Sequence, residues 1–284
     1  MIIDIHTHTF PDKMAASVID KLSHASRTVA FSDGTVDGLI SNMNTSGINL
    51  SVVLPVATNA HQVEHVNNSS AKLNEIYDNK NIISFACLHP DHESYLQELN
   101  RIKSLGFKGI KIHPVYQGTD IDDIKFLRIF ERAAELDLIV VTHAGLDIGF
   151  PGVMRCSPKM CRHVVDEIGD FKLVLAHMGG WKNWDEVPEY LADTKVYIDT
   201  AFSTGFITPR ADSQWNPADL AMLNPEQFIE FVNIFGADRI LFGTDSPWSS
   251  QNESIKFIKQ LSINDEDKKK ILGGNASRIL QIPN

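Results

Sequence analysis

Short apolar runs alternate with segments of helical period along the whole chain, and this alternation constrains the fold more than any other feature. The alternation is typical of βαβ units, in which a strand, a helix and a second strand follow one another. The runs are apolar almost without interruption, which indicates strands that are covered on both faces, as in a parallel sheet. We therefore predict eight strands, at residues 2–6, 50–55, 82–88, 107–113, 138–143, 172–177, 196–200 and 239–245.

Two helix starts are marked by a capping residue followed by proline. Ser157 and Pro158 begin a helix that runs toward Gly169, and Asn224 and Pro225 begin another. The second helix is expected to bury one face, made of Phe228, Phe231, Val232 and Phe235. Further amphipathic helices are expected at residues 91–105 and 122–137.

Eight strands with helices between them form either an open doubly wound sheet or a closed barrel, and the residues after the first strand separate the two. A dinucleotide-binding open sheet carries a glycine-rich phosphate loop there, whereas this chain has HTHTF. No Pro/Gly/Ser-rich linker and no low-complexity stretch divides the chain. The predicted fold class is therefore α/β, a single (β/α)8 TIM-barrel domain over residues 1–284, with a metal site at the carboxyl ends of the strands.

Charge and composition exclude several classes of function. The formal net charge of -10 argues against a nucleic-acid surface, which needs clustered lysines and arginines. The three cysteines, Cys87, Cys156 and Cys161, are odd in number and lack CxxC spacing, so neither a disulfide framework nor a structural zinc site is expected. No apolar run is long enough for a membrane span and the first residues do not resemble a signal peptide, so we expect a cytoplasmic enzyme. A homodimer is left open on the general ground that dimers are the commonest closed assembly.

Polar residues stand at the carboxyl ends of several predicted strands. In a parallel barrel all these ends meet on one face, which is the face that carries the active site. Residues far apart in the sequence would therefore converge there. They are His6 and His8 on the first strand, Lys111 and His113 on the fourth, His143 on the fifth, His177 on the sixth and Asp245 on the eighth.

The pair His6 and His8 has the spacing of metal ligands on a strand, because side chains two residues apart point to the same side. With His143 and Asp245, the pair supplies imidazoles and a carboxylate, a set that suits zinc or a similar divalent ion with a position left open for water. An open position is typical of a catalytic site. The other histidines singled out fall mostly in helix or loop contexts and are expected at the surface or in the core, namely His24, His61, His65, His89, His92 and His163.

The motifs IDIHTH, FKGIKIHP, VTHAG, LAHMGG, YIDTAF, ILFGTDSPW and ILGGNASRIL occur in this order along nearly the whole chain. In these motifs the chain resembles the amidohydrolase superfamily, in particular the amidohydrolase-related branch that includes aminocarboxymuconate semialdehyde decarboxylase. The resemblance implies that His6, His8 and Asp245 bind a metal ion and that His143 binds the same ion or a second one. It also implies that His177 binds a second ion or assists catalysis.

The fourth strand leaves the number of metal ions open. Lys111 resembles the carboxylated lysine that bridges two ions in dihydroorotase-like members, and burial would favour the neutral amine that reacts with carbon dioxide. The alternative is an ordinary lysine that pairs with an acid or points at the substrate beside a single ion, and this mononuclear site is the one we favour. His113, two residues further on the same side, is a candidate for supporting the metal ligands.

The predicted reaction is the hydrolysis of a small molecule. A bound divalent ion lowers the pKa of its water to about 7, so that Asp245 can accept the water proton and pass it to the leaving group, while His177 hydrogen-bonds the oxyanion or the water. Asp199 is a weaker candidate for supporting the site. Two alternatives stay open. One is a decarboxylase in which a similar metal centre and His177 assist proton transfer to carbon, and the other is a barrel that binds a metal or small ligand without turnover.

Substrate recognition is expected to lie in the long loops after the strands, because these loops set specificity in barrels. Arg155 and Arg210 lie in two of these loops. Either guanidinium could clamp a substrate carboxylate or remain in solvent. We expect the substrate to be a small molecule with a carbonyl or carboxylate group.

Overall fold

The structure, a computed structural model, describes residues 1–77 and 81–282, and the chain divides into two compact units. Unit 1 consists of Met1–Ser51 and Thr200–Asn284, and unit 2 consists of Val52–Asp199. Within the described residues, no helix is both long and apolar enough to cross a membrane. The prediction that residues 1–284 form a single domain stays a prediction.

A row of five parallel strands forms the centre of unit 2. The strands are β4 (Ala86–Cys87), β5 (Gly109–Ile112), β6 (Ile139–Thr142), β7 (Leu173–Leu175) and β8 (Tyr197–Asp199). Each strand pairs with the next one along the chain, and one register row runs through Cys87, Lys111, Val141, Val174 and Tyr197. Nearly all residues of these strands are buried, which is why their sequences are apolar almost throughout.

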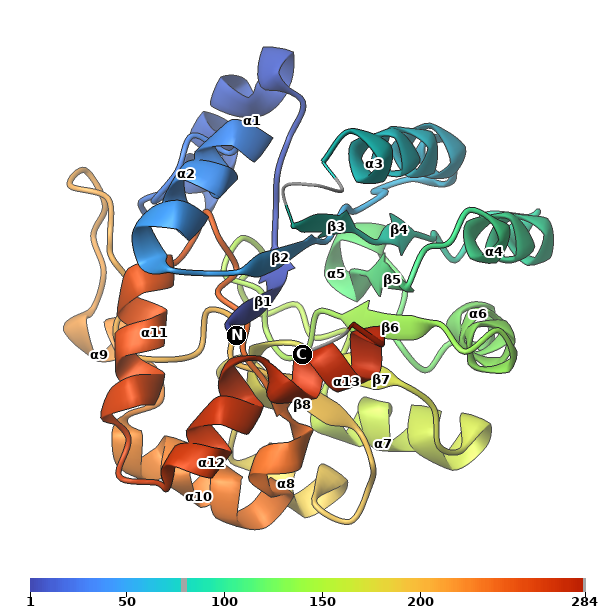
Figure 1. Cartoon of the computed structure of the whole chain (residues 1–284). Helices are drawn as coiled ribbons and strands as arrows, with labels where there is room; N and C mark the ends of the chain where they lie inside the picture. The colour runs from blue at the N-terminus through green and yellow to red at the C-terminus, as the bar shows by residue number, and fades with distance from the viewer. Residues whose placement is uncertain (78–80, 283–284) are drawn as a thin grey trace. The chain divides into compact units, whose positions relative to one another are not determined.

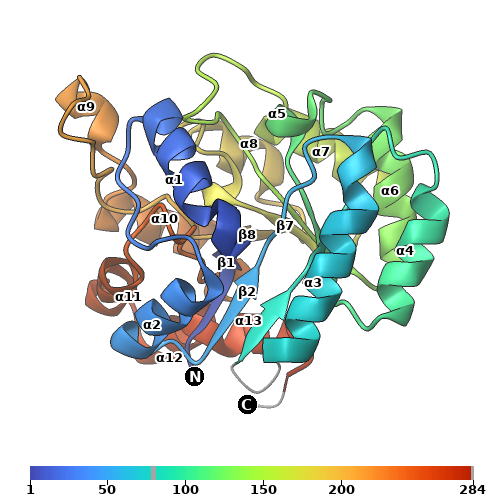
Figure 2. The same ribbon diagram turned by 90° about the horizontal axis from the view of Figure 1, so that it is seen from above.

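Helices and short helical turns alternate with the strands along unit 2. They are η1 (Ala60–Gln62), α3 (Val63–Tyr77), α4 (Tyr95–Ser104), α5 (Pro114–Gln117), α6 (Ile124–Glu135), α7 (Pro158–Ile168), η3 (His177–Gly179) and α8 (Glu186–Leu191). Figure 1 shows α3, α4 and α6 end-on beside the strands, and Figure 2 shows them from the side. Helix α7 begins as predicted, because the side chain of Ser157 accepts a hydrogen bond from the N–H of Met160 and proline follows it.

The third predicted strand, residues 82–88, is divided in the structure. It forms β3 (Ile82–Ser84) and the short β4, with Phe85 between them. Two asparagines of α3 explain the division, because their side-chain amides bond the strand backbone directly. Asn74 pairs with the N–H and carbonyl of Ser84, and Asn67 pairs with those of Cys87. These backbone groups are therefore satisfied by side chains and need no neighbouring strand.

Unit 1 brings together the two ends of the chain. Its strands are β1 (Ile3–Thr7) and β9 (Ile240–Leu241), and β2 (Leu50–Val53) runs across the point where the units divide. The N–H of Ile5 donates to the carbonyl of Phe242 at 2.9 Å, and Thr7 forms a parallel bridge with Ser246. The first and last strands are neighbours, as they are in a (β/α)8 barrel.

The helices of unit 1 include the second one that the caps predict. Asn224 and Gln227 form a reciprocal capping box at its start, and its four predicted apolar residues are buried. The helices are α1 (Asp12–Ser26), α2 (Val36–Ser46), α9 (Pro217–Leu220), α10 (Pro225–Phe235), η4 (Ala237–Arg239), α11 (Gln251–Gln260), α12 (Asp265–Lys269), the π-helix η5 (Lys270–Gly274) and α13 (Asn275–Leu280).

Two strands end before the candidate site residues that were predicted to close them. β7 ends at Leu175 and β9 ends at Leu241, whereas the predicted strands continue to His177 and Asp245. Both His177 and Asp245 have left-handed backbones, with φ of 60° and 62°. A residue in this conformation cannot continue a strand, so the chain turns at both candidate site residues.

Candidate metal centre

Three predicted ligands, His6, His8 and Asp245, lie together in unit 1 and are called the unit 1 triad. The Nε2 of His6 lies 3.2 Å from the Nε2 of His8 and 3.4 Å from the Oδ1 of Asp245. The Nε2 of His8 lies 3.0 Å from the same oxygen. Nitrogen ligands of a tetrahedral zinc ion, each about 2.05 Å from it, lie about 3.3 Å apart. The donor atoms therefore have the spacing of a ligand triangle, and their chemistry fits a divalent metal ion.

Main-chain hydrogen bonds set the spacing of the unit 1 triad. The N–H of Asp245 donates to the carbonyl of His6 at 2.8 Å, and the N–H of His8 donates to the carbonyl of Ser246 at 2.7 Å. The strained backbone of Asp245 is thus held by pairing with β1. Gly243 is needed for close approach, because a Cβ there would lie 2.9 Å from the Cβ of His6. In the sequence Gly243-Thr244-Asp245, the glycine leaves room for the Cβ of His6 and the aspartate provides the N–H that pairs with β1.

A further carboxylate, that of Asp4, lies beside the unit 1 triad and was missed in the sequence analysis. Asp4 is fully buried and accepts side-chain hydrogen bonds from Thr244 and Gln251. Burial raises the pKa of Asp4 to about 7, although its hydrogen bonds act to lower it. The signal that could have found it is its position two residues before His6, which places both side chains on one side of β1.

Unit 2 holds a second group of histidine and carboxylate side chains, made of His113, His143 and Asp147. The Oδ2 of Asp147 lies 3.5 Å from the Nε2 of His113 and 3.9 Å from the Nε2 of His143. The two imidazole rings stack with centroids 4.4 Å apart. These donor atoms are spaced more widely than those of the unit 1 triad. Asp147 was missed because it lies in a loop, where no periodic pattern marks it.

His143 also joins His177, and the four residues His113, His143, Asp147 and His177 are called the unit 2 network. The Nε2 of His143 lies 3.0 Å from the carbonyl oxygen of Leu146, and its Nδ1 lies 3.0 Å from the Nε2 of His177. Because a carbonyl oxygen only accepts hydrogen bonds, the Nε2 of His143 carries the proton. When the ring of His143 is neutral, its Nδ1 accepts from the Nε2 of His177.

The backbone of His177 is held from two sides. Its N–H donates to the Oδ1 of Asp199 at 2.9 Å, and its carbonyl accepts from the indole N–H of Trp184 at 3.0 Å. These bonds stabilise the left-handed conformation at His177, which is costly for a residue other than glycine. Asp199 therefore supports His177 through the main chain.

Lys111 lies on β5 in unit 2 and is 1% exposed. Its neighbours in the register row are Cys87 and Val141. His113 follows two residues later, so the two side chains leave the chain on the same side. The mononuclear site stays the prediction, and a carboxylated Lys111 that bridges two ions stays its alternative.

The two arginines considered for substrate binding both pair with aspartates. The Nη1 of Arg155 lies 2.8 Å from the Oδ1 of Asp120, and the Nε of Arg210 lies 2.9 Å from the Oδ1 of Asp212. Both ion pairs are partly exposed to solvent. The structure therefore favours the surface alternative for both arginines.

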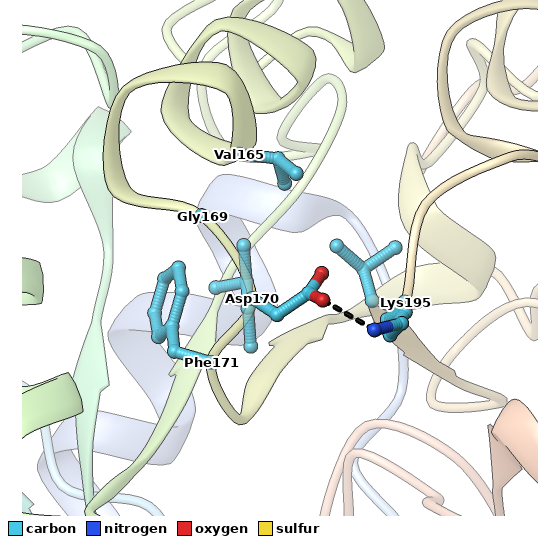
Figure 3. Close-up of a pocket in the computed structure, with 7 residues that line it drawn as sticks. Val165, Gly169, Asp170, Phe171 and Lys195 are labelled. Carbon is cyan, nitrogen blue, oxygen red and sulfur yellow. Dashed lines mark hydrogen bonds and ion pairs between the residues drawn. The ribbon is translucent and has the colours of Figure 1, made fainter.

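Figure 3 shows a hollow in unit 2, and none of its lining residues is a candidate site residue. It is lined by Val165, Gly169 and Phe171 and is bordered by an ion pair between Asp170 and Lys195. Phe171 precedes β7 and Lys195 precedes β8, so the hollow lies at the amino ends of these strands. The active sites of parallel barrels lie at the opposite ends, so we assign this hollow no part in the site.

Solved structures share the fold over the whole chain. An uncharacterised TIM-barrel protein of Bordetella bronchiseptica matches with a TM-score of 0.75 at 17% identity, over 99% of this chain and 98% of that one. The 5-carboxyvanillate decarboxylase of Sphingomonas paucimobilis matches with a TM-score of 0.70 at 17% identity, over 99% of both chains. The fold is therefore the predicted (β/α)8 TIM barrel.

The family follows from the sequence comparison. The family model described as amidohydrolase matches residues 3–282, so the chain belongs to the amidohydrolase family and the predicted resemblance is confirmed. One relative is the 2-amino-3-carboxymuconate-6-semialdehyde decarboxylase of Dictyostelium discoideum, 26% identical over 217 residues, which are 66% of this chain. Another is the gamma-resorcylate decarboxylase of Polaromonas sp. (strain JS666), 26% identical over 129 residues, which are 41% of this chain. The matches span 57% and 36% of the lengths of these two relatives.

Proposed function

We propose that this protein is a metal-dependent decarboxylase that removes carbon dioxide from a small carboxylic acid. The observation that carries the proposal is the ligand spacing of the unit 1 triad, and both relatives reported above are named decarboxylases. The motifs predict hydrolysis first and decarboxylation as the alternative. The names of the two relatives favour decarboxylation.

We assign His6, His8 and Asp245 as ligands of the metal ion. The family resemblance implies that His143 binds the same ion or a second one, and we assign it as a further ligand. Both ring nitrogens of His143 lie 3.0 Å from protein atoms, so ligation would displace one of these contacts.

Zinc is the ion that we propose, because the donors are mainly imidazole nitrogens. Manganese is the alternative, since a solved dihydroxybenzoic acid decarboxylase of Polaromonas contains it. When bound, the ion would act as a Lewis acid toward a substrate oxygen and stabilise the negative charge that develops in the reaction.

Decarboxylation breaks the bond between the carboxylate carbon and its neighbour, and the electron pair left behind takes up a proton. We assign His177 as the donor of that proton. Its ring is oriented by the hydrogen bond to His143, and its backbone is held by Asp199. A fixed imidazole whose ordinary pKa lies near neutrality suits proton transfer at physiological pH. His177 then regains a proton from water.

The number of ions is tested by elemental analysis of protein purified without chelator, beside the Lys111→Ala variant. A single ion per chain in both proteins supports the mononuclear site that we propose. Two ions per chain, with fewer in the variant, would support a carbamate-bridged pair in place of it. No bound ion in the parent protein would contradict the metal centre.

The reaction is tested with the metal-loaded protein in deuterated water. The substrates are small aromatic and unsaturated carboxylic acids, among them 2,6-dihydroxybenzoate and 5-carboxyvanillate, the acids named for the fold relatives. The expected result is release of carbon dioxide, deuterium at the vacated carbon and loss of both in His6→Ala. Turnover of a substrate without carbon dioxide release would contradict decarboxylation.

Hydrolysis is the second candidate, because the matching family model is described as amidohydrolase. In that case Asp245 would accept a proton from water and pass it to the leaving group. Products labelled from oxygen-labelled water, without carbon dioxide, would support hydrolysis.

Metal binding with no turnover of any tested acid or ester would support a non-catalytic binding barrel. The cytoplasmic location and the homodimer stay predictions.

A further inference from the structure

The carboxylate of Asp4 receives four hydrogen bonds within unit 1 although its side chain is fully buried. Its Oδ1 accepts from the N–H of His6 at 3.3 Å and from the N–H of Thr244 at 3.0 Å. Its Oδ2 accepts from the hydroxyl of Thr244 at 2.6 Å and from the Nε2 of Gln251 at 2.8 Å. Each carboxylate oxygen can accept two hydrogen bonds, so the two oxygens match this set of four donors.

These bonds connect three segments of unit 1. Asp4 lies on β1 two residues before His6, Thr244 directly precedes Asp245, and Gln251 is the first residue of α11. The hydroxyl of Thr244 also accepts from the N–H of Ser246 at 3.2 Å. The bonds that start at Asp4 therefore reach both sequence neighbours of Asp245.

We propose that Asp4 is a positioning residue that keeps His6 and Asp245 at metal-binding spacing and is not itself a ligand. Both of its oxygens are occupied by donors from the protein, so neither is directed at the triangle of donor atoms. The proposal rests on the metal centre proposed above. A partner of this kind, one step removed from the ion, typically changes metal affinity by about 10–100-fold when it is lost.

The test compares Asp4→Asn and Thr244→Val with the parent protein and with Ser277→Ala. Asparagine replaces one acceptor oxygen by an N–H donor, and valine removes the hydroxyl bonded to Asp4 while keeping the side-chain shape. Ser277, on α13, is a matched control. It has a buried hydroxyl in unit 1, and this hydroxyl donates a hydrogen bond to the carbonyl of Ile282 at 2.7 Å. The readouts are the dissociation constant of zinc, by competition with a chromophoric chelator, and the visible spectrum of the cobalt-substituted protein.

The expected result is weaker zinc binding by about 10–100-fold in both test variants, with a changed cobalt spectrum, and parent values in Ser277→Ala. If Asp4→Asn does not fold, Thr244→Val alone decides the outcome. Parent affinity and spectrum in the folded variants would overturn the positioning role and leave the metal centre intact. Failure of the parent protein to bind any divalent ion would overturn the metal centre and the role of Asp4 together.

Discussion

The unit 1 triad and the unit 2 network use the same kinds of side chain but are built in different ways. Main-chain hydrogen bonds between β1 and the segment after β9 hold the donor atoms of the triad 3.0 to 3.4 Å apart. Side-chain contacts join the network, and its carboxylate oxygen lies 3.5 and 3.9 Å from two imidazoles. Main-chain pairing fixes positions that ligation requires, whereas linked imidazoles are suited to carrying protons.

The largest effect is expected on breaking the unit 1 triad. His6→Ala and Asp245→Asn should lose the bound ion, and activity should fall by about 10³-fold or more, since the ion supplies several kcal/mol of transition-state stabilisation. Elemental analysis and the carbon dioxide assay check this. His113→Asn is the control from the unit 2 network and should retain its ion. Equal ion loss in all three variants would remove the distinction between the two groups.

The next effect concerns His177, which we assign to proton transfer. His177→Asn should retain the ion and lose activity by about 10²–10⁴-fold, the range for a lost general acid. The exposed His163→Asn serves as the control and should keep parent activity. An ion content in His177→Asn as low as that of His6→Ala would show that His177 is a ligand and not the proton donor.

A smaller effect is expected for Asp147, which lies beside two imidazoles of the unit 2 network. Asp147→Asn removes the charge but preserves the size of the side chain, so kcat/KM should fall about tenfold, the loss for a supporting residue. The ion content should not change. Asp120→Asn, which removes a partly exposed carboxylate paired with Arg155, is the control. Loss of the ion in Asp147→Asn would place this residue among the ligands.

The smallest effect concerns Glu98, a buried carboxylate of unit 2 that lies outside the network and bonds Asn67 and Arg101. Burial acts to raise the pKa of Glu98, but the hydrogen bonds outweigh it and lower the pKa below its ordinary value of 4.5. The ionised group therefore stabilises the fold above the unfolded pKa, and this contribution is lost as the pH falls through the folded pKa.

Glu98→Gln should accordingly lower the free energy of unfolding by about 1–3 kcal/mol at neutral pH, without change in ion content. Urea unfolding near neutral pH and at about pH 3 checks this, and the difference between variant and parent should shrink at the lower pH. Glu253→Gln on the exposed face of α11 is the control and should change stability by less than about 1 kcal/mol. A difference that grows toward low pH would contradict the assigned direction of the pKa.

The parts of the fold that follow from local patterns were predictable. All eight predicted strands occur, and α7 and α10 begin at their predicted caps. The division of the third strand was not predictable, because it depends on Asn67 and Asn74 reaching the strand backbone from α3. A polar side chain on a helix carries no local sign of such a partner.

The candidate site divides in the same way. His6 and His8 share a strand, and the period of two places them together before any tertiary structure is known. His143 and His177 lie at the ends of neighbouring strands, so the parallel order also predicts their contact. Asp147 lies in a loop, and Asp4 is an aspartate like many at protein surfaces. Neither could be identified as a site residue without knowing its burial and its hydrogen-bond partners.

Periodicity, caps and the order of the motifs determined the barrel, the family and the main candidate ligands, because these features depend on residues near one another or on the order of the strands. Tertiary structure alone decided that Asp4 binds four donors and that the carboxylate of Asp147 lies beside two imidazoles. Such contacts join residues as many as 247 positions apart. Only a folded chain brings these groups within hydrogen-bonding distance, because a hydrogen bond requires its atoms within about 3 Å.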